Sequence, residues 1–436
     1  MIKKLGSLTP LLIVNFIGTL GVSLVMPFLV FLVKRFGGNE VIYGIVGATY
    51  SASQFVGAPI LGKLSDHMGR KRILLVSQAG TLISWLIFLI ALYIPMIDLW
   101  SNQESSVLGQ LTLTLPLLLL FISRVLDGLT GGNISVANAY LADISTDENR
   151  NENFGKMSAS SNLGFVIGPM IAGLLGATVL GEKLPVISAV MIAFIGLLAI
   201  QFLLKESHTA GIMRMSSTWF MRKVLGLESK CAYEKKLKKH QVSPTFCIPG
   251  VKSMLFLYFI IFLAFNVFYA AFPIHAVDGL SWNSVELGIY FSVLSGSMVL
   301  VQGVLLPAIS KYFSEIRLIL MGTLGLCVSF ALLLRQDLFS LYISALFFAG
   351  GNGLMWPSFM SILGNLGEKK QQGGIQGLAT SMGSLASILG LLGGGFMYKM
   401  FGAKSFLVGA LLFFIVFLCS LTILRSISSS KQTMMT

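Results

Sequence analysis

The sequence is poor in charged residues. Asp, Glu, Lys and Arg together make up 11% of its 436 residues, whereas hydrophobic residues make up 55%. Soluble domains carry about 25% charged residues, so too few charged side chains are present here to cover a water-facing surface. These proportions exclude an ordinary soluble domain and favour a chain whose solvent is bilayer lipid. The 46 glycines agree with this, because glycine lets membrane helices approach one another closely.

Cysteine is also scarce. The four cysteines, Cys231, Cys247, Cys327 and Cys419, show neither the spacing of a metal site nor that of a disulfide framework. The sequence contains no nucleotide-binding loop, catalytic triad or cluster of metal ligands. We therefore expect a protein that is not an enzyme and that needs no metal or cofactor.

Long apolar runs are abundant. A membrane helix needs about 20 mostly apolar residues, and about twelve such runs are found. The predicted spans are 8–33, 42–62, 73–95, 114–141, 155–180, 184–204, 251–273, 285–310, 317–335, 338–364, 373–400 and 405–425. The sequence therefore predicts an all-α integral membrane protein with twelve transmembrane helices.

The net charge of +13 comes from residues placed between the spans, and not from an amphipathic surface suited to nucleic acid. With a cytoplasmic N-terminus, most basic residues fall on the cytoplasmic side. The opposite side then holds Lys34, Arg35, Lys183, Arg335, Lys399 and Lys404. This asymmetry predicts that both termini are cytoplasmic, since basic residues gather in cytoplasmic loops.

The two halves of the sequence repeat. Gly131-Gly132-Asn133 in the fourth span matches Gly350-Gly351-Asn352 in the tenth, and Tyr43-Gly44 matches Leu287-Gly288. Six spans in each half predict bundles at 1–204 and 251–436, related by a pseudo-two-fold axis, with a site between them. The basic linker, 205–250, is interpreted as a solvated loop. A short amphipathic helix on the inner leaflet is the alternative.

The stretch after the second span has the most specific pattern, and we place it in a loop whose glycines allow a tight turn. It reads Gly62-Lys63-Leu64-Ser65-Asp66-His67-Met68-Gly69-Arg70-Lys71-Arg72. It resembles the signature loop of the major facilitator superfamily, although His67 stands where the family usually has arginine. The resemblance implies a cytoplasmic gate made by Gly62, Asp66, Gly69, Arg70, Lys71 and Asp143. In that gate Asp66 would lie near the N-terminal end of the eleventh span, and Arg70 would pair with Asp143. A plain positively charged loop is the alternative.

The fifth span carries small residues on one stripe and a proline, at Gly155, Gly164, Gly168, Pro169 and Gly173. This pattern resembles the signature of the drug:proton antiporter branch of the family, with twelve spans, as in tetracycline and multidrug exporters. Small residues allow close helix contact and proline allows a bend. We expect an outer gate here. Ordinary helix packing is the alternative.

Arg124 and Asp127 are the charged residues that we place deep in a span. Arg124 lies roughly 15 Å into the fourth span, where a charge costs at least ~2.5 kcal/mol and therefore needs a partner. Asp127, three residues on, lies on the same face. The first span, at Ile17-Gly18-Thr19-Leu20-Gly21, lacks the acid that tetracycline exporters often carry. Asp127 with Arg124 is therefore the proton-coupling candidate, and a structural ion pair is the alternative.

Other polar residues in the spans are candidates for a substrate cavity, although amides in spans also hold helices together. These candidates are Asn15, Gln54, Asn133, Asn138, Asn266, Tyr269, Gln302, Asn352 and Trp356. His275, at the outer end of the seventh span, is interpreted as a loop or interface histidine.

The resemblance implies a monomeric secondary transporter of the cytoplasmic (inner) membrane that works by alternating access. Its partners would be a small amphipathic molecule, protons and membrane lipid, with export in exchange for protons. An uptake carrier for a metabolite or siderophore-like solute is the alternative within this class. A membrane receptor or assembly factor that transports nothing is the alternative from another class.

Overall fold

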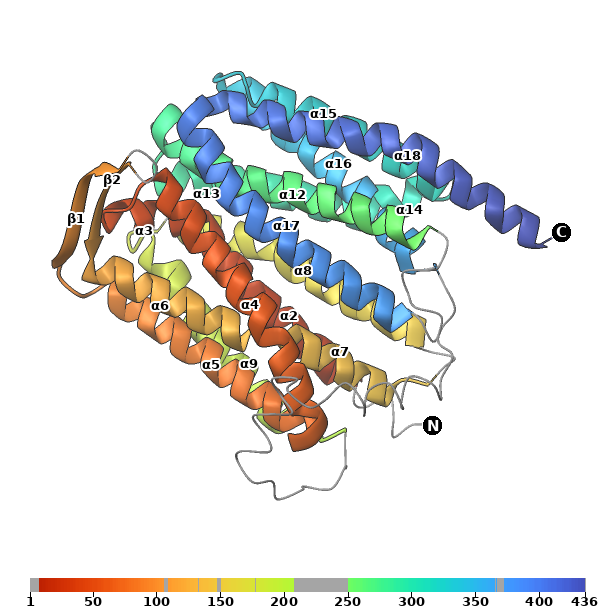
Figure 1. Cartoon of the computed structure of the whole chain (residues 1–436), viewed down its shortest axis with the longest axis horizontal. Helices are drawn as coiled ribbons and strands as arrows, with labels where there is room; N and C mark the ends of the chain where they lie inside the picture. Colours follow the sequence, from red (N-terminus) through yellow and green to blue (C-terminus); the bar gives the residue numbers. More distant parts are fainter. Residues whose placement is uncertain are drawn as a thin grey trace.

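Long helices that run roughly side by side make up most of the computed structural model (Figure 1). The structure describes residues 8–105, 109–131, 133–146, 150–176, 178–207, 250–364, 366 and 372–435. We call residues 8–207 the first half and residues 250–435 the second half. The linker segments that contain Leu225 and Lys236 lie outside the described residues. The domain boundaries at 204 and 250 remain a prediction.

The helices match the predicted spans in order. Those of the first half are α2 (Leu8–Val25), α3 (Leu29–Arg35), α4 (Glu40–Met68), α5 (Arg70–Ala91), α6 (Leu115–Thr130), α7 (Asn133–Ile144), α8 (Arg150–Gly176) and α9 (Lys183–Leu203). Those of the second half are α12 (Val251–Ile274), α13 (Ser284–Leu300), α14 (Leu306–Ile309), α15 (Glu315–Leu332), α16 (Leu338–Gly364), α17 (Gln372–Phe401) and α18 (Ser405–Met435).

Helix length and hydropathy agree with a membrane location. Among the described residues, ten helical segments are long and apolar enough to cross a membrane, and the last of them, Gly377–Thr422, covers parts of both α17 and α18. α4 adds a further helix of 29 residues. In a bilayer every backbone polar group must be satisfied internally, which helices achieve. The predicted all-α membrane architecture is confirmed.

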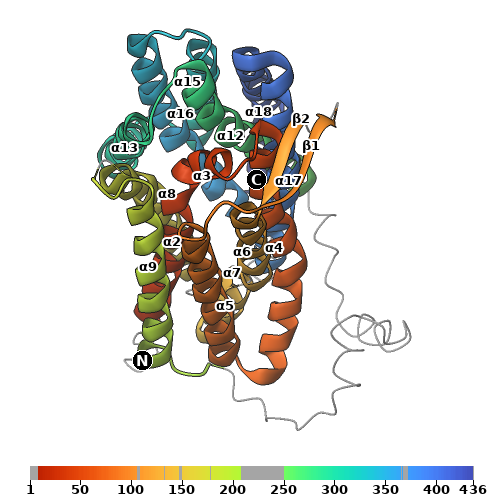
Figure 2. The same cartoon turned by 90° about the vertical axis from the view of Figure 1, so that its left-hand side faces the viewer.

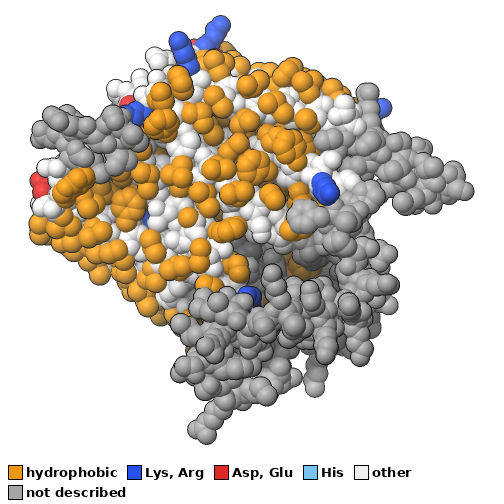
Figure 3. Space-filling view, in the orientation of Figure 1, with side chains coloured by type: hydrophobic (Ala, Val, Ile, Leu, Met, Phe, Trp, Pro, Cys, Tyr) orange, Lys and Arg blue, Asp and Glu red, His pale blue; other side chains and the backbone are white. Residues whose placement is uncertain are grey.

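Hydrophobic side chains cover much of the face seen in Figure 3, and few charged side chains interrupt them. Large apolar residues such as Phe202, Leu300 and Phe339 are exposed on the helices. Inside the second half, rings such as Phe268, Phe272 and Phe348 are fully buried and pack against one another. The protein therefore has an apolar surface around an apolar core, as expected in lipid.

A β-hairpin marks one end of the molecule and was not predicted. β1 (Asp98–Ser105) pairs antiparallel with β2 (Gly109–Thr114) between α5 and α6 (Figures 1 and 2). The hairpin is fixed to the α3–α4 connection, because Thr112 N donates to Gly37 O at 3.3 Å and Thr114 Oγ1 donates to Phe36 O at 2.7 Å. We call this end the hairpin end, and the opposite end, where Ser207 and Gly250 lie, the linker end.

The structure corrects the predicted loop after the second span. α4 continues through Gly62 and Asp66 to Met68, and α5 begins at Arg70. Gly69 alone makes the turn, with φ of 95° and ψ of 146°, a conformation that favours glycine. Gly62 is helical and does not turn the chain. The motif therefore occupies two helix ends joined by one residue.

The two repeated Gly-Gly-Asn stretches adopt different backbones. In the first half α6 ends at Thr130 and α7 begins at Asn133, so the predicted fourth span is divided. In the second half α16 runs unbroken through Gly351, which packs so closely on α15 that a Cβ would lie 2.6 Å from Gly322 O. The two Gly-Gly-Asn stretches therefore match in sequence but differ in backbone structure.

Candidate functional site

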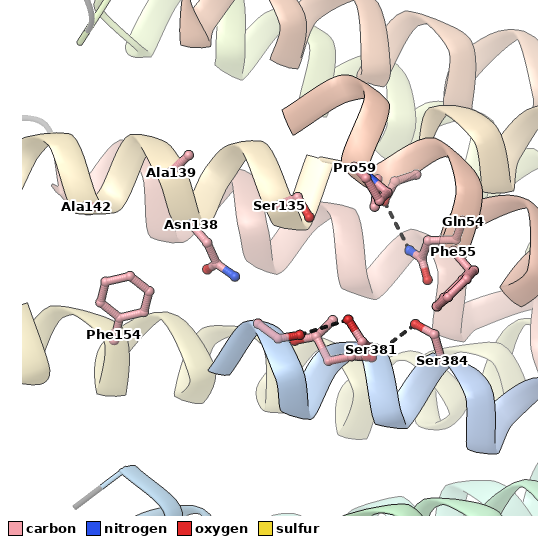
Figure 4. A pocket seen from close by; sticks show the side chains of 14 residues that line it. Gln54, Phe55, Pro59, Ser135, Asn138, Ala139, Ala142, Phe154, Ser381 and Ser384 are labelled. Atoms are coloured by element: carbon pink, nitrogen blue, oxygen red, sulfur yellow. Dashed lines mark hydrogen bonds between the residues drawn. The ribbon is translucent and has the colours of Figure 1, made fainter. Parts of the chain in front are cut away.

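A cavity of about 480 Å³ lies between the halves, in the part of the molecule toward the linker end. Its walls come from α4, α7 and α8 of the first half and from α17 of the second half (Figure 4). The residues that line it are Gln54, Phe55, Ala58, Pro59, Gly131, Ser135, Asn138, Ala139, Ala142, Phe154, Gly377, Thr380, Ser381 and Ser384. None of these lining residues is charged.

The lining combines rings with amide and hydroxyl groups. Phe55 and Phe154 supply apolar surface, and Asn138 lies across the cavity from Ser381 (Figure 4). Gln54 Nε2 already donates to Gly131 O at 3.0 Å, and Ser381 Oγ donates to Gly377 O at 3.0 Å. The Asn138 amide makes no hydrogen bond to another described residue, so its donors and acceptor are free to meet a bound molecule.

Close backbone contacts between the halves lie at the hairpin end. On one side α4 meets α17, where a Cβ on Gly44 would lie 2.6 Å from Leu391 O and one on Gly395 would lie 3.3 Å from Gly44 Cα. On the other side α8 meets α13, where a Cβ on Gly173 would lie 2.1 Å from Gly288 O. Gly44 and Gly288 are equivalent in the sequence repeat. The two contacts are therefore pseudo-symmetric counterparts.

Hydrogen bonds cross the same boundary. Tyr43 of α4 donates its hydroxyl to Tyr269 O of α12 at 3.0 Å, and Ser292 of α13 donates to Met170 O of α8 at 3.1 Å. Tyr43 is 5% exposed, so water does not compete freely for this bond. Side-chain bonds thus reinforce the glycine contacts that join the halves at the hairpin end.

At the linker end, Arg70 is the centre of a polar network. Its guanidinium lies 2.6 Å from Asp66 Oδ1 and 3.0 Å from Asp143 Oδ2, and it donates to Ser65 Oγ at 2.6 Å. The backbone N of Arg70 donates to Glu206 Oε1 at 2.7 Å. Arg70 is 7% exposed. A buried guanidinium requires such partners, because an unpaired buried charge is strongly destabilising.

Arg124 and Asp127 form a second ion pair inside the first half. Arg124 Nη1 lies 3.5 Å from Asp127 Oδ2, and the residues are 2% and 1% exposed. The guanidinium also lies 4.4 Å from the centre of the Trp85 ring, a favourable cation–π geometry. Arg124 Nε and Nη2 have no hydrogen-bond partner among the described residues.

Similarity to known proteins agrees with this fold. A family model described as Major Facilitator Superfamily matches residues 11–214 and 254–433, which is most of the chain. The chain belongs to the major facilitator superfamily. The predicted twelve-helix major facilitator fold and the assignment to a secondary transporter, and not to an enzyme, are therefore confirmed.

The relatives within the superfamily include tetracycline resistance proteins. The chain is 29% identical to the class C tetracycline resistance protein of Escherichia coli over 381 residues, which cover 85% of this chain and 84% of that protein. It is 28% identical to the class G tetracycline resistance protein of Vibrio anguillarum over 420 residues, which cover 94% of this chain and 95% of that protein. The predicted likeness to the drug antiporter branch is confirmed.

Solved structures of the superfamily share the fold. The crystal structure of the human organic anion transporter MFSD10 (TETRAN) aligns with a TM-score of 0.64 and 19% identity, covering 96% of this chain and 99% of that one. A partially occluded inward open conformation of the Escherichia coli xylose transporter XylE aligns with a TM-score of 0.69 and 14% identity, covering 96% and 97%. At these identities the two structures support the fold alone.

In this member of the superfamily, the predicted gate residues are partly brought together. Arg70 pairs with Asp143 as expected, and Lys71 Nζ donates to Gln201 O at 2.7 Å. The Asp66 side chain is 55% exposed and pairs with Arg70. The predicted contact of Asp66 with the start of α17 is not among the contacts of the described residues.

The glycines of α8 have different neighbours. A Cβ on Gly164 would lie 2.1 Å from Thr19 Oγ1 and one on Gly168 would lie 1.9 Å from Ser23 Oγ, both on α2 of the same half. Gly173 meets the second half, whereas a Cβ on Gly155 would meet nothing within 4 Å. Pro169 lies inside α8. Of this stripe, Gly173 thus makes the contact that crosses between the halves.

Two of the predicted cavity residues, Gln54 and Asn138, line the cavity. The Asn133 side chain lies outside what the structure describes. Asn15 joins α2 to α8, donating to Met157 O at 3.1 Å and to Ser161 Oγ at 2.6 Å.

The remaining candidates lie in the second half, away from this lining. Asn266 donates to Phe262 O at 2.8 Å within α12, and Asn352 lies 3.9 Å from Met298 Sδ. Tyr269 accepts the Tyr43 bond through its backbone, and Trp356 packs against Phe359 with ring centres 6.1 Å apart. Gln302 lies in a π-helical turn, Val301–Leu305, next to Gly353.

Sequence reasoning missed Glu206, Ser381 and Phe154. Glu206 lies where the linker leaves α9 and accepts from the first backbone N–H groups of α5, which attract negative charge. This contact could not be predicted, because an acidic residue beside the end of a predicted span does not by itself indicate a partner. Ser381 and Phe154 lie near the starts of the eleventh and fifth spans, and a small residue or a ring in a span is too common to indicate a cavity.

Proposed function

We propose that this transporter exports small amphipathic molecules from the cell in exchange for protons. The observation that carries the proposal is the cavity between the halves, with rings beside amides and hydroxyls, below a hairpin end where the halves are in contact. Such a lining suits an uncharged or amphipathic molecule, since no lining residue would pair with a fixed charge. The resistance proteins among the relatives favour export.

The same proposal places the linker end in the cytoplasm. The basic residues between the spans favour this orientation, with both termini inside the cell and the protein in the cytoplasmic membrane. The described conformation would then be the one that receives its cargo from the cytoplasm. The proposed working unit is the monomer, because each chain contains both halves and the cavity between them.

Proton coupling is the finer part of the proposal, and Asp127 is its first candidate. The pair with Arg124 is buried inside the first half, and neither residue lines the cavity. Both residues belong to α6, so a rigid movement of the two halves leaves their contact unchanged. Access of a proton to Asp127 would therefore need water to enter beside Arg124 Nε and Nη2, which have no hydrogen-bond partner among the described residues.

The proposal is tested with the protein in inside-out membrane vesicles. Tetracycline and a lipophilic fluorescent dye serve as probes, and the vesicle interior is acidified so that the proton gradient is directed outward. We expect both probes, or one of them, to accumulate in the vesicles until a protonophore collapses the gradient. Equal accumulation in vesicles that lack the protein, or accumulation unaffected by the protonophore, would contradict it.

A further inference from the structure

An ion pair joins the two halves at the hairpin end. The Lys34 ammonium, near the end of α3 in the first half, contacts the carboxylate of Asp278 in the second half. The same ammonium lies 3.7 Å from Glu40 Oε1, at the start of α4 in the first half. The three side chains are 23%, 33% and 27% exposed in that order, so the cluster is only partly open to solvent.

The two acids differ in the half to which they belong. Glu40 and Lys34 are both in the first half, so a rigid movement of one half against the other preserves their contact. Asp278 belongs to the second half, so any opening at the hairpin end separates it from Lys34. We propose that Lys34 and Asp278 are positioning residues of the transport cycle, whose ion pair holds the hairpin end closed.

The chain holds Asp278 in a well-defined place. Asp278 lies in a π-helical turn, His275–Gly279, that follows α12. Leu280 N donates to His275 O at 3.0 Å, which closes this turn. His275 is 1% exposed, and its Nδ1 lies 3.0 Å from the hydroxyl of Tyr398 on α17. The turn that carries Asp278 is thus tied to α17.

The ion pair lies beside the glycine contact between α4 and α17. Tyr398 follows Gly395 by three residues on α17, and a Cβ on Gly395 would lie 2.7 Å from the carbonyl oxygen of Glu40. Opening the hairpin end must therefore break the Lys34–Asp278 pair and the α4–α17 packing together. The glycine contacts between α4 and α17 involve no charged group. The Lys34–Asp278 ion pair therefore supplies the electrostatic attraction that holds the hairpin end closed.

Loss of the Lys34–Asp278 ion pair should change the ratio of two conformations, one with the hairpin end closed and one with it open. The expected change is modest but measurable. Partly exposed ion pairs contribute at most about 1 kcal/mol, which is about a fivefold change in the ratio of two conformations. A transporter must visit both conformations, so their free energies differ by a few kcal/mol at most. A fivefold change in their ratio is therefore visible in a population measurement.

The test measures the distance between two spin labels in vesicles, without substrate or pH gradient. The labels are placed at Val179→Cys in the first half and Gln336→Cys in the second half, both exposed near the hairpin end, in a protein whose four native cysteines are replaced by serine. Asp278→Asn and Lys34→Gln should each raise the ratio of long to short distances about fivefold. The double variant should resemble either single variant, because both remove the same contact.

Glu40→Gln is the matched control, since it removes the other acid beside Lys34 without touching the contact between halves. It should leave the distance distribution unchanged. An unchanged distribution in Asp278→Asn, additive effects in the double variant, or an equal shift in Glu40→Gln would overturn the inference. Because no transported molecule is used, this result is independent of the proposed export and of its coupling to protons.

Discussion

Gly173 of α8 and Gly288 of α13 lie backbone to backbone across the two halves of the transporter. A Cβ on Gly173 would be 2.1 Å from Gly288 O, and a Cβ on Gly288 would be 2.8 Å from Gly173 Cα. Real side chains do not approach that closely, so an added methyl group must push the helices apart. The contact shows why a pattern of small residues recurs where one half touches the other.

The first prediction concerns this contact. Gly173→Ala should favour separation of the halves at the hairpin end, changing the ratio of the two conformations by about tenfold or more. The spin-label distance between positions 179 and 336 measures it. Gly364→Ala is the control, because a Cβ at Gly364 would meet nothing within 4 Å. An unchanged distance distribution in Gly173→Ala would mean that the halves do not need this close approach.

Gly168→Leu should affect the packing inside the first half, unlike Gly173→Ala, although both glycines lie on α8. A Cβ at Gly168 would be 1.9 Å from Ser23 Oγ of α2, inside the first half. We therefore expect lower yield and lower thermal stability of the purified protein, with turnover falling because the first half is distorted. Thermal unfolding in detergent measures this. Parent-like stability and transport in Gly168→Leu would show that α8 and α2 are not packed as described.

A third prediction compares two glycines of one motif. Gly69 has a positive φ, and a Cβ there would lie 2.6 Å from Glu206 Oε2, whereas a Cβ on Gly62 would meet nothing within 4 Å. Gly69→Ala should lower the free energy of unfolding by about 1–3 kcal/mol, and Gly62→Ala should change it little. Loss of thermal stability is the readout. Equal effects of the two substitutions would contradict the turn at Gly69.

Removal of Arg70 should reduce transport strongly. Arg70→Ala removes the ion pairs with Asp66 and Asp143 at once and leaves a partly buried Asp143 without its cation. We expect transport to fall by about tenfold or more, and Asp66→Asn to reduce it less, because Asp66 is largely exposed. Initial transport rates, normalised to protein in the membrane, check this. Arg72 is exposed, so Arg72→Ala should transport normally. If Arg72→Ala loses transport as Arg70→Ala does, the loss does not come from the Arg70 ion pairs.

Asn138 should matter for the choice of cargo. Its amide is free in the cavity, whereas the Asn352 amide lies outside the cavity lining. Asn138→Ala should change the relative rates for tetracycline and a less polar dye several-fold, since a hydrogen bond is worth about 1 kcal/mol. Asn352→Ala should leave that ratio as it is. A parent-like ratio in Asn138→Ala would place the cargo elsewhere.

Much of this architecture follows from sequence, because burial of a helix in lipid depends on length and hydropathy alone. The twelve apolar runs match the helices in order, and the Arg70–Asp143 pair was implied by the signature motif. The hairpin of β1 (Asp98–Ser105) and β2 (Gly109–Thr114) was not predicted, because a search for apolar runs passes over it. The helical course of the motif through Met68 was also missed, since charged residues at a helix end look like a loop.

The candidate site was less predictable. Whether an amide such as Asn138 or Asn15 faces a cavity or a neighbouring helix depends on the rotation of its helix, which composition does not reveal. The contact of Gly44 with Gly395 joins residues some 350 positions apart in sequence and depends on how the halves dock. Pairs such as Lys34 and Asp278 require the same docking. Local patterns identify helices, and tertiary packing decides which residues meet.

The most direct measurement for the central claim uses the reverse of proton-driven export. Purified protein is placed in vesicles that contain a pH-sensitive dye, with equal pH inside and outside, and a tetracycline gradient is imposed. If export is exchange for protons, movement of the drug down its gradient must drive protons the other way, and the internal pH must change until the drug gradient is spent. The account predicts that pH change in the parent. Drug movement at an unchanged internal pH would contradict it.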